Sequence, residues 1–181
     1  MDELESAEAA LAVLDGVLGI ITAEDRSRQT PCREFDVAGL TDHLLNSITM
    51  IGGAAGAEIL DRDPDASVRE QVVAAARPAV AAWRRRGVGG TVPFGAGEVP
   101  ALMMARILSL EFLVHAWDYA VAVGHPLEVP ADQSDLVLTW ARQIITPEGR
   151  ERAGFDDPVE VAPDASALDR LVAYTGRGPA S

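Results

Sequence analysis

The stretch RILSLEFLVHAWDYAVAVG, residues 106–124, is apolar at most positions yet carries Glu111 and His115 four residues apart. Residues with this spacing lie side by side on an α-helix, with Cβ atoms about 5–6 Å from each other. An unpaired carboxylate in an apolar core is costly or takes up a proton, and a divalent cation would remove that cost. The segment therefore predicts a core helix, and the two polar residues predict either an ion pair or part of a metal site.

A second histidine follows the helical period in DVAGLTDHLLNSITMI, residues 36–51. Leu40, His43 and Leu44 fall on one side of this predicted helix, so His43 is expected to face the core. Two helices could then supply a His, Glu, His set. Three protein ligands leave one coordination position open for water, a thiol or a substrate. On spacing alone, a Glu–His ion pair and a hydrogen-bonded core histidine remain alternatives to a metal site.

The other helices are predicted from apolar periodicity and from capping signals such as Ser67 and Glu70, which match the S-x-x-E capping box. Strand signals are almost absent, and neither a repeat nor a domain linker is visible. We therefore predict a single all-α domain over residues 1–181, a four-helix bundle with accessory C-terminal helices. The predicted helices span 3–23, 37–60, 67–86 with a kink at Pro78, 100–124 with Pro100 in its first turn, about 132–146, and a short stretch within 166–176; an extended piece is expected at 91–94.

Composition excludes several classes of partner. The chain has no lysine and a formal net charge of −13, which argues against binding to nucleic acids or to an anionic membrane surface. The segment 106–124 would place Arg106, Glu111, His115 and Asp118 in hydrocarbon, so it is not expected to span a membrane. The single Cys32 and the lack of a signal-peptide pattern at the start indicate a cytoplasmic protein. A homodimer is compatible with the sequence.

Three segments, TPCREFDVAGLTDHLL, EFLVHAWDYAVAVG and LDRLVAYTGRGP, together resemble the mycothiol-dependent maleylpyruvate isomerase N-terminal-domain family, within the DinB-like metal-binding helical bundle superfamily. The resemblance extends over nearly the whole chain. It implies a DinB-like four-helix bundle in which His43, Glu111 and His115 bind a divalent metal ion, zinc in first place and nickel, iron, manganese or cobalt as alternatives. It also implies a low-molecular-weight thiol such as mycothiol as cofactor and a small electrophilic molecule as substrate.

The function expected from this resemblance is that of a metal-dependent thiol S-transferase or isomerase-like enzyme whose substrate the sequence does not name. A dication deprotonates a coordinated thiol at neutral pH, and the thiolate can then add to an electrophilic carbon. Two alternatives stay open at this point. The first is a hydrolase that uses metal-bound water, and the second is a metal-binding module without catalysis.

Four further residues are weaker candidates. Asp118 either accepts a hydrogen bond from a ligand imidazole, pairs with an arginine, or is an acid on the helix surface. Cys32 either has a pKa lowered by the N-terminus of the next helix or is a small buried residue. Arg170 and Arg177 could face an anionic thiol cofactor or a substrate carboxylate, because the arginine fork matches a carboxylate.

Overall fold

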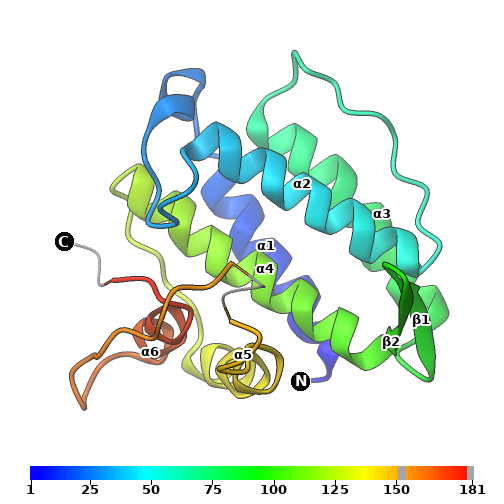
Figure 1. The fold of residues 1–181 in the computed structure, drawn as a ribbon. Coiled ribbons are helices and arrows are strands. Elements are labelled where there is room, and N and C mark those ends of the chain that lie inside the picture. Colours follow the sequence, from blue (N-terminus) through cyan, green and yellow to red (C-terminus); the bar gives the residue numbers. More distant parts are fainter. Residues whose placement is uncertain (151–153, 179–181) are drawn as a thin grey trace.

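Helices make up most of the fold, as the apolar periodicity predicts (Figure 1). The computed structural model describes residues 1–150 and 154–178. Within these residues the elements are α1 (Glu3–Leu18), the 3-10 turn η1 (Ala23–Ser27), α2 (Val37–Ala54), α3 (Val68–Arg86), β1 (Thr91–Phe94), β2 (Gly97–Pro100), α4 (Ala101–Ala122), α5 (Ala131–Ile144) and α6 (Ala167–Tyr174). The prediction of a mainly helical fold is confirmed.

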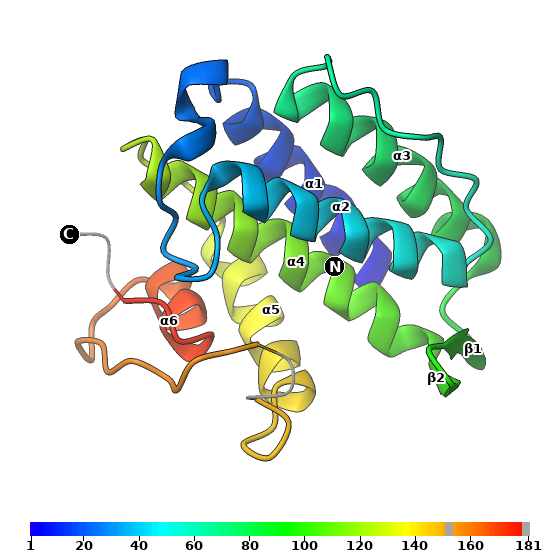
Figure 2. The same cartoon turned by 45° about the horizontal axis from the view of Figure 1, so that its top comes forward.

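The helix α4 is the centre of the arrangement, because it packs against α1, α2, α5 and α6. The helix α3 lies against α1 and α2, while α5 and α6 pair with each other on the other side of α4 (Figures 1 and 2). A helix that is apolar on all sides is one that neighbours cover on all sides. This explains why α4 has buried residues around its whole circumference along much of its length.

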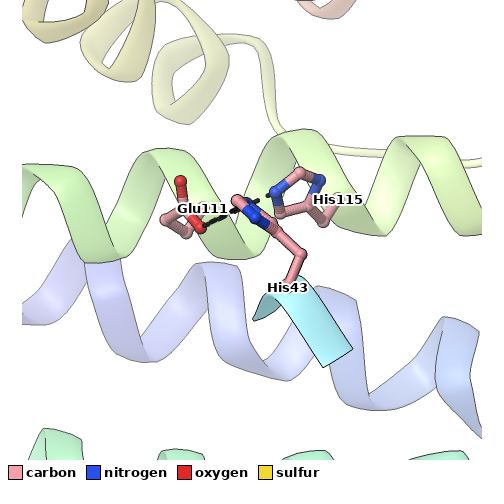
Figure 3. A group of neighbouring side chains, drawn as sticks. All are labelled: His43, Glu111 and His115. Atoms are coloured by element: carbon pink, nitrogen blue, oxygen red, sulfur yellow. Dashed lines mark ion pairs between the residues drawn. The ribbon is translucent and has the colours of Figure 1, made fainter. Parts of the chain in front are cut away.

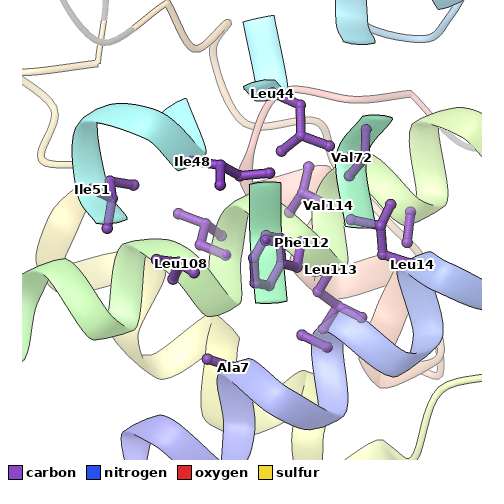
Figure 4. Packing of buried hydrophobic residues seen from close by; sticks show 14 of the residues in the cluster. Ala7, Leu14, Leu44, Ile48, Ile51, Val72, Leu108, Phe112, Leu113 and Val114 are labelled. Carbon is purple, nitrogen blue, oxygen red and sulfur yellow. The ribbon is translucent and has the colours of Figure 1, made fainter. Parts of the chain in front are cut away.

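The core lies where the four long helices meet. Leu14 from α1, Ile48 from α2 and Val72 from α3 pack around Phe112 and Leu113 of α4 (Figure 4). These five side chains are at most 1 % exposed. Among the described residues, no helix has both the length and the apolar character needed to cross a membrane.

The helix boundaries differ from the predicted ones where glycine or proline intervenes. The first helix ends at Leu18, and α2 ends at Ala54 instead of continuing to residue 60. Gly56 follows α2 with φ +77°, a conformation that L-residues rarely adopt and that ends a helix. Pro100 precedes α4 as its N-cap and is not in its first turn. The helix α3 runs through Pro78.

A small β-hairpin adds to the predicted helical fold. The extended piece at 91–94 is β1, but it pairs in antiparallel register with β2, which was not predicted. The pairing of Phe94 with Gly97 leaves a two-residue loop whose first residue, Gly95, has φ +60°. Glycine at this position is what a type II′ turn requires. The hairpin was missed because β2 has only four residues and lacks an alternating apolar pattern.

Two adjacent glycines of α2 are expected to respond in opposite ways to alanine. A Cβ on Gly52 would lie 2.7 Å from the Cβ of Ala79 on α3 and 3.2 Å from Cδ1 of Ile59. We expect Gly52→Ala to lower the free energy of unfolding by about 1–3 kcal/mol through overpacking. A Cβ on Gly53 would have no neighbour within 4 Å. Gly53→Ala should therefore raise the free energy of unfolding by about 0.5–1 kcal/mol, because alanine favours the helix more than glycine does. Denaturant unfolding measures both, and a stabilising Gly52→Ala would contradict the close approach of α2 to α3.

Candidate metal centre

His43, Glu111 and His115 lie together between α2 and α4 (Figure 3). Each offers one potential ligand atom, and these atoms all lie within 4.8 Å of one another. The Nε2 atoms of the two histidines are each 3.6 Å from Oε2 of Glu111. The α-helical period places Glu111 and His115 one turn apart on α4, while His43 comes from the N-terminal half of α2. The structure therefore brings the three predicted ligands together.

The carboxylate of Glu111 has a buried oxygen atom that lacks a hydrogen-bond partner among the described residues and could bind a cation. Its Oε2 atom is buried and has no hydrogen-bond partner among the described residues, because 3.6 Å is too long for a hydrogen bond to either histidine. Such an unsatisfied buried acceptor costs about 1–3 kcal/mol. Two imidazole nitrogens and one carboxylate oxygen form a donor set that suits zinc and other first-row divalent ions. The residues present thus fit a divalent cation.

The charges within the cluster depend on one another. Burial favours the neutral acid of Glu111, but the contacts with His115 and His43 outweigh burial and hold its pKa well below the ordinary value of 4.5. Burial likewise favours the neutral imidazole of His115, but Asp118 and Glu111 outweigh it and raise the pKa above the ordinary value of 6.5. A cation that enters the cluster therefore competes with a proton for His115.

Asp118 makes both of the contacts that were considered for it. Its Oδ2 atom lies 2.9 Å from Nδ1 of His115. It also accepts hydrogen bonds from Arg177, at 2.8 Å from Nε to Oδ1 and at 2.7 Å from Nη2 to Oδ2. Burial raises the pKa of this carboxyl, but the Arg177 charge and the His115 contact outweigh burial, so the net shift is downward. The alternative of a surface acid is wrong, since Asp118 is 0 % exposed.

Cys32 and the two arginine candidates occupy different environments. Burial raises the pKa of the Cys32 thiol, although the nearby Arg177 charge acts in the opposite direction. A pKa lowered by the helix N-terminus is therefore the wrong interpretation, and partial burial is the better one. Arg170 donates to Asp135 of α5 at 2.8 Å. It does not line the small cavity that adjoins His43, Glu111 and His115, which is described in the next paragraph. Arg177 does line that cavity.

A small cavity of about 120 Å³ adjoins the cluster. Beyond the three candidate ligands, it is lined by Cys32, Glu34, Phe35, Leu110, Val114, Gly154, Phe155 and Arg177. A second cavity of about 230 Å³ shares five of these residues, so the two are neighbours. Segments 31–34, 154–156 and 175–177, far apart in the sequence, form the walls of the second cavity. A larger cavity of about 680 Å³ beside α2 and α3 contains none of the candidate ligands.

Two aromatic residues beside the cluster were not predicted. The ring of Phe35 stacks on His43 with centroids 5.2 Å apart, and Phe155 lines the cavity. Phe35 directly precedes Asp36, the N-cap of the helix that carries His43. This position next to the start of the helix is the feature of the sequence that could have indicated a residue near His43. Phe155 had no such signal, because it lies in a long connection between α5 and α6.

Similarity to known proteins extends over nearly the full length of the chain. The Mycobacterium tuberculosis proteins named Uncharacterized protein MT0763 (strain CDC 1551 / Oshkosh) and Uncharacterized protein Rv0738 (strain ATCC 25618 / H37Rv) are each 27 % identical to it over 184 residues. Each match covers 98 % of this chain and 98 % of the relative. No protein-family model and no solved structure matches. The similarity therefore comes without an assigned activity.

Proposed function

We propose that this protein is a metal-dependent thiol S-transferase or isomerase-like enzyme built on a DinB-like four-helix bundle. In this proposal His43, Glu111 and His115 hold a divalent cation, zinc in first place. The observation that carries it is the buried Oε2 of Glu111, which has no hydrogen-bond partner among the described residues and has an imidazole nitrogen of each histidine 3.6 Å away. The packing of α1 to α4 around one core agrees with a four-helix bundle. The family resemblance of the segments around these residues supports the thiol chemistry.

The residues around the cluster suit the handling of a thiol. A bound cation would lower the pKa of a coordinated thiol and so present a thiolate to an electrophile. Glu111 would reduce the net charge of the centre, and Phe35 covers one face of the His43 ring. Leu110, Val114 and Phe155 give the adjoining cavity part of an apolar wall. Burial raises the pKa of the Cys32 thiol, so its surroundings in the protein do not activate it as a thiolate.

Thiol binding tests this proposal directly. Mycothiol or a simpler thiol should bind the zinc-loaded protein with release of about one proton, because the S–H group must ionise to coordinate the metal. Calorimetry in two buffers of different ionisation enthalpy counts the protons. In the cobalt-substituted protein, sulfur coordination should add a charge-transfer band in the near ultraviolet.

Two controls assign the signal to the cluster. The metal-free protein should show neither the proton release nor the band, and Cys32→Ser should show both, because the thiol under test comes from solution. Absence of thiol binding by the loaded protein, with mycothiol included, would contradict the proposal. Turnover of esters or amides would then favour a hydrolase, and absence of any turnover would favour a metal-binding module.

A further inference from the structure

We infer that Arg177 is a positioning residue for the proposed metal centre and that it acts through Asp118 to fix the orientation and tautomer of His115. The inference rests on the proposed function, because it assigns a role to Arg177 in holding one of the proposed metal ligands. The sequence-based expectation that Arg177 faces an anionic ligand is a separate role, and Arg177 lines the cavity that such a ligand would enter. The contacts of the guanidinium carry the positioning role.

Three of the five N–H groups of Arg177 are engaged within the protein. Nε and Nη2 form a two-bond fork with the carboxylate of Asp118, at 2.8 Å and 2.7 Å, and Nη1 lies 3.3 Å from the carbonyl oxygen of Thr175. Arg177 is 6 % exposed and Asp118 is 0 % exposed, so water does not weaken this pair. Both N–H groups that form the fork, on Nε and Nη2, are therefore committed to Asp118. The position of Arg177 is explained by what it does to Asp118.

A closely packed turn carries Arg177 to Asp118, which is 59 positions away in the sequence. The turn follows α6, and the backbone N–H of Arg177 donates to the carbonyl of Val172 at 3.1 Å. Gly176 has φ +86°, and a Cβ there would lie 2.6 Å from the backbone oxygen of Asp156. Glycine is therefore needed at this position for both conformation and space. The C-terminal segment is thus fitted tightly enough to hold the arginine fork in one place.

The fork determines which hydrogen bond Asp118 can form with His115. With Asp118 held as a carboxylate by two N–H donors, its Oδ2 atom can accept the hydrogen on Nδ1 of His115, 2.9 Å away. The neutral ring then carries its hydrogen on Nδ1 and keeps a lone pair on Nε2, the atom that lies 3.6 Å from Glu111. Hydrogen bonds of this kind orient histidine ligands and increase their basicity. Without Arg177, the buried carboxylate would keep only the His115 contact and would lose the fork that fixes its orientation.

Substitutions of two arginines separate positioning from general stability. We expect Arg177→Gln to weaken zinc binding by about 10–100-fold, measured by competition with a chelator, and to change the visible spectrum of the cobalt form. Arg177→Lys keeps the charge but not the fork, so it should recover part of the affinity and lose only about fivefold. The matched control is Arg170→Gln, which removes a more exposed arginine paired with Asp135 and should bind zinc as the wild type does.

A nuclear magnetic resonance measurement reads the tautomer of His115. In the zinc-loaded wild type, a long-range proton–nitrogen spectrum should show the hydrogen on Nδ1, and this pattern should change in Arg177→Gln. A folded Arg177→Gln with wild-type zinc affinity and cobalt spectrum would overturn the inference. If this variant does not fold, Arg177→Lys decides, and wild-type values in all three measurements would overturn it. Absence of zinc binding by the wild type would instead overturn the proposed metal site itself.

Discussion

Replacement of His43 with alanine is expected to abolish tight zinc binding, while the wild-type protein keeps about one zinc per chain. His43 is the candidate ligand that comes from α2, and its loss leaves only Glu111 and His115 on α4. Loss of one of three protein ligands should weaken binding by orders of magnitude. His43 is also the most suitable ligand to remove, because its side chain is 38 % exposed and its replacement should disturb the core little.

The matched control is His125→Ala. His125 follows the end of α4, is exposed, and lies outside the cluster, so its replacement should leave the zinc content unchanged. Elemental analysis after dialysis measures the content, and thermal unfolding with and without zinc provides a second measurement, since a ligand stabilises the state that binds it. Retention of stoichiometric zinc by His43→Ala would refute the assignment of this ligand.

The stabilisation by zinc is expected to grow as the pH rises from about 5.5 to 8. In the metal-free protein, the pKa of Glu111 is lowered, so its contribution to stability is present above 4.5 and is lost as the pH falls through the lower folded value. The pKa of His115 is raised, so its contribution is complete below 6.5 and is lost as the pH rises through the higher folded value. Zinc binds the neutral imidazole of His115, so its affinity rises as the pH rises and His115 loses its proton. The contribution of protonated His115 to the stability of the metal-free protein falls over the same pH range.

Melting temperatures with and without zinc across this pH range test the expectation. The difference between them should increase with pH in the wild type and in His125→Ala. It should be small at every pH in His115→Gln, which lacks both the titrating group and the ligand. A zinc effect of equal size at acidic and alkaline pH in the wild type would contradict competition between zinc and the His115 proton.

Local patterns in the sequence account for much of what was predicted correctly. The period of apolar residues is a property of each segment, so it located α1 to α4 and, within a few residues, α5 and α6. The spacing of Glu111 and His115 is also local, because one helical turn suffices to place them side by side. The N-cap Asp36 and the capping box of Ser67 and Glu70 involve residues at most three positions apart, and both are present.

Contacts between distant segments could not be predicted in this way. The close approach of Gly52 to Ala79 depends on the crossing of α2 and α3. Periodicity within one segment contains no information about such distances.

For the candidate site, the sequence by itself indicated which residues could bind a cation and placed Glu111 and His115 one turn apart on a core helix. It also predicted that His43 faces the core, whereas its side chain is 38 % exposed. Only the tertiary structure decided that the ligand atoms of these three residues lie within 4.8 Å of one another, because the packing of α2 on α4 sets that separation. It also decided that Arg177 pairs with Asp118 and that burial raises the pKa of Cys32. The physical reason is that hydrogen bonds and desolvation depend on which atoms surround a group in space, and chain segments far apart in the sequence supply those atoms.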